Sequence, residues 1–149
     1  MQSVKGFNGV EKVSIPRNTL DGVEIQEIDS GLYGNNLYKV CINKLIFVFG
    51  RIESSKVYEN MSHPDRKVFK HYIPFTISEG GDTTWLRLLF SETETERSFK
   101  VLAINTLDGS FKVVKGFKGI NTSQFLALTI DIVEMRITEM KNQVIPPRI

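Results

Sequence analysis

The sequence predicts an all-β protein that folds as a single domain, an antiparallel β-sandwich of the jelly-roll kind. Residue usage gives the first indication, because alanine, the best helix former, occurs only at positions 103 and 127, whereas Val, Ile and Thr are abundant. Ten phenylalanines supply the bulk that fills the space between packed sheets. A length of 149 residues, of which 41% are hydrophobic, suits one domain with a core of its own.

Two dense apolar runs, residues 37–42 and 45–52, are separated by two turn-type residues. This arrangement predicts two strands joined by a tight hairpin. In the second run Leu45, Phe47 and Phe49 share one face, and the opposite face is also apolar. A strand that is apolar on both faces is typical of the centre of a sandwich or of a subunit interface.

The middle of the chain predicts further strands separated by polar segments. Residues 53–67 are polar and are expected to form a long loop. The strand expected over 68–77 contains Pro74, which lacks an N–H for the ladder, so this strand is predicted to lie at an edge or to break there. Another strand is expected over 85–90, and the Asp-Gly pair at 108–109 is typical of a type I′ hairpin turn.

The C-terminal region is ambiguous in its hydrophobic period. Apolar residues occupy positions 126, 128, 130 and 132, and this alternation favours a strand over 125–137. The alternative is a helix, whose apolar stripe begins at Phe125 and runs to Met135. The β-branched content favours the strand. Residues 138–149, which include two consecutive prolines, are expected to form an extended tail.

Several classes of chemistry are not indicated. The net charge is +2 with acids and bases mixed, which gives no basic face for nucleic acid, and no apolar stretch is long enough for membrane insertion. Cys41 stands in an apolar run and is expected to be a small buried residue. His63 and His71 have no metal-ligand spacing, and no phosphate-binding loop occurs. We therefore expect no cofactor, no metal and no catalytic residues.

Exposed aromatic residues with polar neighbours are the usual means by which a β-domain binds a ligand, because rings stack on sugar faces and polar groups bind hydroxyls. The alternative for the single tryptophan is that it fills the core at the start of a strand. The candidate ligand-binding residues are Tyr58, His63, Tyr72, Asp82, Trp85 and Arg87.

One longer pattern resembles a known family. Residues 37–52 (LYKVCINKLIFVFGRI), the aromatic-Ile-Pro step at 71–75, the hairpin at 105–111 and the apolar closing segment at 125–133 resemble the head domains of phage tail-fibre and receptor-binding proteins. The resemblance covers about residues 37–133. It implies a trimeric β-sandwich tip or a baseplate-associated component that attaches to host-surface saccharide or to another tail protein. It implies no catalytic residue.

The resemblance also implies a domain plan and an assembly. In this plan, residues 1–36 are an attachment segment with a β-hairpin. Residues 37–137 are the β-sandwich domain, and residues 138–149 are an extended tail. In the implied homotrimer, Leu45, Phe47 and Phe49 are expected to meet around the three-fold axis. The protein is expected to be made in the host cytoplasm and to be part of the phage tail in the virion.

Other functions remain open beside the tail protein. They are a virion connector or decoration protein without receptor binding, a stand-alone carbohydrate-binding module, and a small β-barrel enzyme or ligand carrier.

Overall fold

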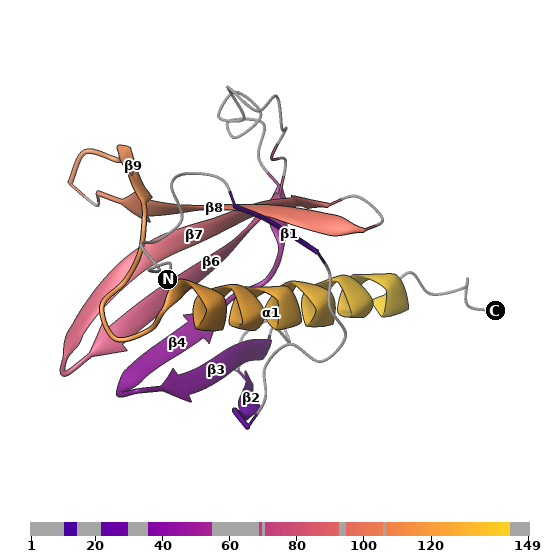
Figure 1. Ribbon diagram of the computed structural model, residues 1–149, viewed down its shortest axis with the longest axis horizontal. Coiled ribbons are helices and arrows are strands. Elements are labelled where there is room, and N and C mark those ends of the chain that lie inside the picture. Colours follow the sequence, from indigo (N-terminus) through magenta and orange to yellow (C-terminus); the bar gives the residue numbers. More distant parts are fainter. Residues whose placement is uncertain are drawn as a thin grey trace, which may run out of the picture.

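The computed structural model describes residues 11–14, 22–29, 36–54, 69, 71–92, 95–105 and 107–143. These residues form nine strands and one long helix (Figure 1). The elements are β1 (Glu11–Ser14), β2 (Ile25–Asp29), β3 (Asn36–Ile42), β4 (Leu45–Phe49), β5 (Glu53–Ser54), β6 (His71–Glu79), β7 (Asp82–Glu92), β8 (Glu96–Ile104), β9 (Phe111–Val114) and α1 (Thr122–Gln143).

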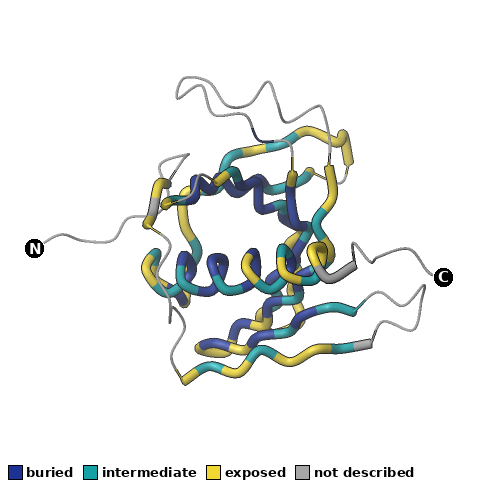
Figure 2. Tube along the Cα trace, turned by 90° about the vertical axis from the view of Figure 1, so that its right-hand side faces the viewer, coloured by how far each residue is buried: buried dark blue, intermediate teal, exposed yellow. Residues whose placement is uncertain are grey.

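All nine strands belong to one antiparallel sheet in the order β1-β8-β7-β6-β4-β3-β2, with β5 beside β6 and β9 beside β8. The sheet is strongly curved and wraps around α1, so that the two ends of the sheet lie on different sides of the helix (Figures 1 and 2). The prediction of a mainly antiparallel β, single-domain protein is confirmed. The second layer among the described residues is the helix and not a second sheet, so the sandwich is not confirmed.

The two strands that the structure describes before residue 36 do not form the expected hairpin with each other. β1 pairs with β8 and β2 pairs with β3, and they occupy opposite ends of the strand order. Both strands are therefore part of the sheet and extend it at its two edges.

The hairpin predicted around residues 43–44 is confirmed as β3–β4. Asn43 and Lys44 both have positive φ, 50° and 74°, as a two-residue type I′ turn requires. The β8–β9 hairpin is also present, but its loop is longer than a two-residue turn. The Asn105 amide donates to Ser110 and the Gly109 amide donates to Asn105, and only Gly109 of the 108–109 pair has positive φ.

Pro74 lies inside the sheet and not at its edge, because β6 pairs with β7 on one side and with β4 and β5 on the other. The missing N–H is tolerated because β4 pairs only as far as Phe75 and β5 begins opposite Tyr72. The Gly50 amide donates to the Pro74 carbonyl at 2.8 Å in this gap. A Cβ on Gly50 would come within 3.1 Å of the proline ring, which explains the glycine.

Residues 122–143 form a helix, so the strand predicted over 125–137 is wrong, and residues 138–143 are not an extended tail. The helix begins with a capping box. The Gln124 amide donates to the Asn121 side chain at 2.8 Å, and the Asn121 amide donates to the Gln124 side chain at 3.2 Å. The strand-like alternation has a simple cause, because the curved sheet buries the helix on several sides and the apolar residues at 126, 128, 130 and 132 are all buried.

The larger of two hydrophobic clusters in the described residues lies between α1 and the concave inner face of the sheet, where the buried residues of both elements face one another (Figure 2). Phe47, Phe49, Phe75 and Phe125 stack or tilt against one another with ring centroids 5.0–6.1 Å apart. Leu45, Phe47 and Phe49 all belong to this core, and Phe47 and Phe49 are 0% exposed. The prediction that these three residues form an oligomer interface is therefore wrong.

Two buried arginines join the helix to opposite halves of the sheet through hydrogen bonds and an ion pair. Arg97 of β8 donates to Glu92 at 2.7 Å, to Glu134 of α1 at 2.5 Å and to the Ile130 carbonyl at 3.3 Å. Arg136 of α1 donates to the carbonyls of Gly50 and Asn36 at 2.8 and 2.7 Å. Each guanidinium is satisfied by several acceptors, which is what a buried charge requires.

Candidate functional site

The outer face of the sheet, turned away from α1, carries the exposed tryptophan. Trp85 of β7 alternates with the core residue Leu86 and is 58% exposed. Its cross-strand neighbour Thr76 pairs in turn with Val48 of β4. Ile46, two residues before Val48 on the same face, is 37% exposed. We call Ile46, Val48, Thr76 and Trp85 the outer-face patch.

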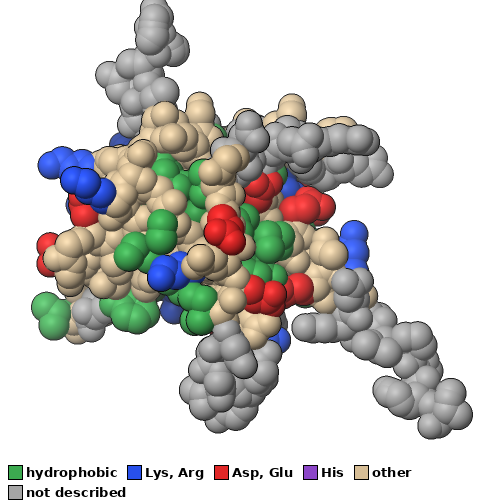
Figure 3. Space-filling view, turned by 90° about the horizontal axis from the view of Figure 1, so that it is seen from below, with side chains coloured by type: hydrophobic (Ala, Val, Ile, Leu, Met, Phe, Trp, Pro, Cys, Tyr) green, Lys and Arg blue, Asp and Glu red, His purple; other side chains and the backbone are tan. Residues whose placement is uncertain are grey.

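The sequence left open whether Trp85 is exposed for binding or fills the core. The structure shows that the ring is exposed and does not fill the core. A large ring in the interior of a strand, open to solvent, is a typical anchor of binding surfaces. Figure 3, which views the molecule from below relative to Figure 1, shows hydrophobic side chains reaching the surface between charged ones. Ile46 lay on the second apolar face of the 45–52 run, so its position was visible in the sequence pattern.

Arg87 and Tyr72 lie on the same face as Trp85, next to the outer-face patch. The Arg87 guanidinium lies 4.5 Å above the ring of Tyr72 and 5.7 Å from that of Phe111. Tyr72 is only 7% exposed, and its hydroxyl donates to Glu53 at 2.7 Å. Tyr72 is therefore a support beneath Arg87 and offers no open ring for stacking, contrary to the prediction.

The remaining predicted ligand residues fall in different places. Tyr58 and His63 lie outside the described residues. Asp82 lies at the start of β7, on the inner side of the sheet, away from Trp85. The structure thus brings together Tyr72, Trp85 and Arg87 and separates Asp82 from them. Cys41, expected to be buried, is exposed.

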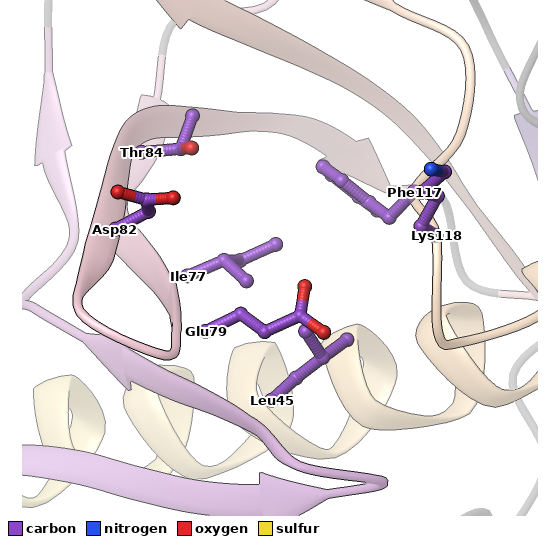
Figure 4. A pocket seen from close by; sticks show the side chains of 7 residues that line it. All are labelled: Leu45, Ile77, Glu79, Asp82, Thr84, Phe117 and Lys118. Atoms are coloured by element: carbon purple, nitrogen blue, oxygen red, sulfur yellow. The ribbon is translucent and has the colours of Figure 1, made fainter.

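Asp82 lines a pocket of about 190 Å³ at the tip of the β6–β7 hairpin (Figure 4). The floor is apolar, and the opposite wall comes from the segment that precedes α1. That segment is held in place by the Asn43 side chain, which donates to the Gly119 carbonyl at 3.0 Å. The seven lining residues are Leu45, Ile77, Glu79, Asp82, Thr84, Phe117 and Lys118.

One serine–histidine contact exists, but its geometry does not indicate a nucleophilic site. Ser54 Oγ lies 2.9 Å from His71 Nδ1, and both residues are exposed. Within the described part of the chain, no hydrogen bond joins His71 to a carboxylate that would orient its ring. The described residues also contain no cluster of three or more His, Cys, Asp or Glu side chains suited to a metal ion.

The comparisons with known proteins give no relative. No family model, no curated protein and no solved structure matches the chain. Among the residues that the structure describes, no helix has the length and apolar character that a membrane span requires.

Proposed function

We propose that this protein is a non-enzymatic structural component of a phage tail or fibre, and that it attaches to protein through the outer-face patch. The observation that carries the attachment is the 58% exposure of Trp85 in the interior of a strand. The phage-tail assignment is supported by the sequence resemblance over about residues 37–133 alone. In this proposal the protein is made in the host cytoplasm and becomes part of the tail of the virion.

The composition of the patch favours a protein partner over a soluble ligand. Trp85, Ile46 and Val48 present apolar surface, with Thr76 between them. Beside them, the hydroxyls of Ser78 and Thr83 are hydrogen-bonded to each other at 3.0 Å. Interfaces between proteins are enriched in aromatic residues at their centre, surrounded by residues that exclude water. Because Leu45, Phe47 and Phe49 are buried in the core, the homotrimer implied by the resemblance needs another apolar surface, and among the described residues the outer-face patch offers one.

The solution mass, measured by light scattering over a range of concentrations, tests this proposal. We expect a mass near three times 17.0 kDa, about 51 kDa, for the wild-type protein and the 17.0 kDa monomer for Trp85→Ser. Leu107→Ser is the matched control, because Leu107 is 95% exposed in the β8–β9 loop and outside the patch. This variant should keep the wild-type mass. A wild-type monomer at every concentration would contradict the trimer. A trimer mass for Trp85→Ser would contradict assembly through the outer-face patch.

A second candidate is a carbohydrate-binding module, favoured by Arg87 beside the exposed ring of Trp85. A flat ring stacks on a sugar face while a guanidinium binds its hydroxyl or carboxylate groups. Trp85 is the only tryptophan, so its fluorescence reports this surface directly. Saturable changes with neutral or acidic oligosaccharides, absent in Arg87→Met, would support this candidate. Unchanged fluorescence across such a panel would argue against it.

A further inference from the structure

Two acidic residues of the pocket come from the tip of one hairpin (Figure 4). Glu79 and Asp82 are direct cross-strand partners on either side of the turn made by Gly80 and Gly81. Like charges in this arrangement repel each other and destabilise the hairpin. Among the described residues neither carboxylate takes part in an ion pair. A cation held between them would relieve the repulsion.

The rest of the pocket adds an apolar and aromatic lining. Leu45 and Ile77 are buried side chains of the core and form its floor, and the ring of Phe117 lies at the opposite wall (Figure 4). Phe117 packs on Phe125 of α1, with ring centroids 5.0 Å apart, so its position is fixed by the helix. An aromatic wall attracts cations as well as apolar groups. The pocket therefore combines negative charge with hydrophobic surface.

This lining suits an organic cation better than a metal ion. Hard divalent cations need several oxygen ligands in a closed arrangement, and the described residues offer two carboxylates and the Thr84 hydroxyl on an apolar floor. A volume of about 190 Å³ is below the range typical of pockets for drug-sized molecules, so the ligand is small.

We propose that the pocket at the tip of the β6–β7 hairpin binds a small alkylammonium group, with the positive charge between Glu79 and Asp82 and its carbon atoms on Leu45, Ile77 and Phe117. Lys118 lies at the same wall as Phe117, across the pocket from Asp82 (Figure 4). Its ammonium group repels a cationic ligand, so removing this charge should strengthen binding. The site is on the opposite side of the sheet from Trp85 and is independent of the outer-face patch.

Backbone amide NMR of the full chain tests this proposal, with tetramethylammonium and n-butylammonium as probes. We expect saturable shifts of the amides of residues 79–84 and 117–119. Neopentyl alcohol, a neutral molecule of similar shape to tetramethylammonium, should give much weaker shifts. Glu79→Gln and Asp82→Asn should each lower the affinity about threefold, which is the size expected for an exposed ion pair.

The charge at position 118 gives the sharpest control. Lys118→Gln should raise the affinity for both cations, whereas Glu24→Gln, a matched change at an exposed carboxylate outside the pocket, should leave it unaltered. Weaker binding by Lys118→Gln would overturn the proposal in favour of an anionic or zwitterionic ligand. Equal shifts by neopentyl alcohol, or no saturable shift at the pocket amides, would also overturn it.

The same titration separates two sources of the ammonium group. A blocked peptide with a central lysine presents the group as a partner protein would, and n-butylammonium presents it as a free metabolite would. Tighter binding of the peptide would support the proposal with a protein lysine as the ligand. Equal or tighter binding of the free amine would support it with a small molecule as the ligand.

Discussion

The Arg136 guanidinium lies over the ring of Tyr38, with 4.1 Å between the guanidinium carbon and the ring centroid. The same guanidinium donates to Glu139, which also accepts a hydrogen bond from the Tyr38 hydroxyl. One side chain of α1 is therefore joined to β3 by a cation–π contact, and to the ends of β3 and β4 by hydrogen bonds to the backbone at Asn36 and Gly50. Burial lowers the pKa of Arg136 to about 10, with the nearby Arg51 charge adding to the effect, and the charge of Glu27 opposes it.

Replacing Arg136 with methionine should lower the free energy of unfolding by about 3 kcal/mol, because the two backbone carbonyls lose their donor inside the protein. Urea denaturation followed by circular dichroism measures this change. Lys141→Met is the control, since Lys141 is exposed in the last turn of the same helix. A loss of less than 1 kcal/mol for Arg136→Met would show that the helix is held mainly by its apolar contacts.

The capping box at the start of α1 predicts a second stability effect. Asn121→Ala should cost about 1 kcal/mol, because the Gln124 amide loses its acceptor. Ser123→Ala, at an exposed position within the same turn, should change the free energy of unfolding by less than about 0.5 kcal/mol. Equal effects of the two substitutions in urea denaturation would argue against the cap.

Because Phe47 lies in the core, a substitution there should change the stability of the protein but not its oligomeric state. Phe47→Leu should lower the free energy of unfolding by about 1–2 kcal/mol, because the smaller side chain leaves space beside Phe49 and Phe125. The mass of the folded variant in solution should equal that of the wild type. If this variant kept full stability but changed its mass, Phe47 would belong to an interface after all.

The turn between β8 and β9 predicts a local pH dependence. The Ser110 hydroxyl and amide donate to the Asp108 carboxylate at 2.7 and 2.9 Å, and these bonds lower the pKa of Asp108 below 3.8. Their contribution to the turn is fully present above that value and is lost as the pH falls through the lowered pKa. An NMR titration should show this low pKa, and Ser110→Ala should raise it toward 3.8. An unchanged Asp108 pKa in Ser110→Ala would contradict the assignment of cause.

The β3–β4 hairpin could be predicted from the sequence because its signals are local, whereas the Asp-Gly pair at 108–109 predicted a two-residue turn where the loop is longer. The alternation within the apolar runs and the turn residues Asn43 and Lys44 determine the β3–β4 hairpin without reference to the rest of the chain. Pro74 misled the prediction, because the gap between β4 and β5 that accommodates it depends on how three other strands pair with β6.

The helix could have been recognised from its cap but not from its apolar pattern. The Asn-x-x-Gln box at 121–124 was visible in the sequence. The periodicity was ambiguous because a helix enclosed by a curved sheet is apolar around much of its circumference, and both Ile130 and Ile132 are buried. The same curvature brought Leu45, Phe47 and Phe49 against α1, which no local pattern could distinguish from an oligomer interface.

The candidate site was only partly predictable. The sequence identified Trp85, Arg87 and Tyr72 as candidate ligand-binding residues. They share one face of the sheet because they lie on paired strands in register. Their exposure could not be predicted, because it depends on which face of the sheet α1 covers. Asp82 was also identified, but the pocket that it lines includes Phe117 and Lys118, which are distant in sequence and are brought there by the start of the helix.

The most direct test of attachment through the outer-face patch is quenching of Trp85 fluorescence by acrylamide at increasing protein concentration. Trp85 is the only tryptophan, so no other residue contributes to the signal. If the chain assembles through this patch, the quenching constant should be high for the dilute protein and should fall severalfold over the concentrations at which the mass rises toward 51 kDa, three times 17.0 kDa. A quenching constant that stays high while the mass rises would contradict the account, because the chain would then assemble through another surface.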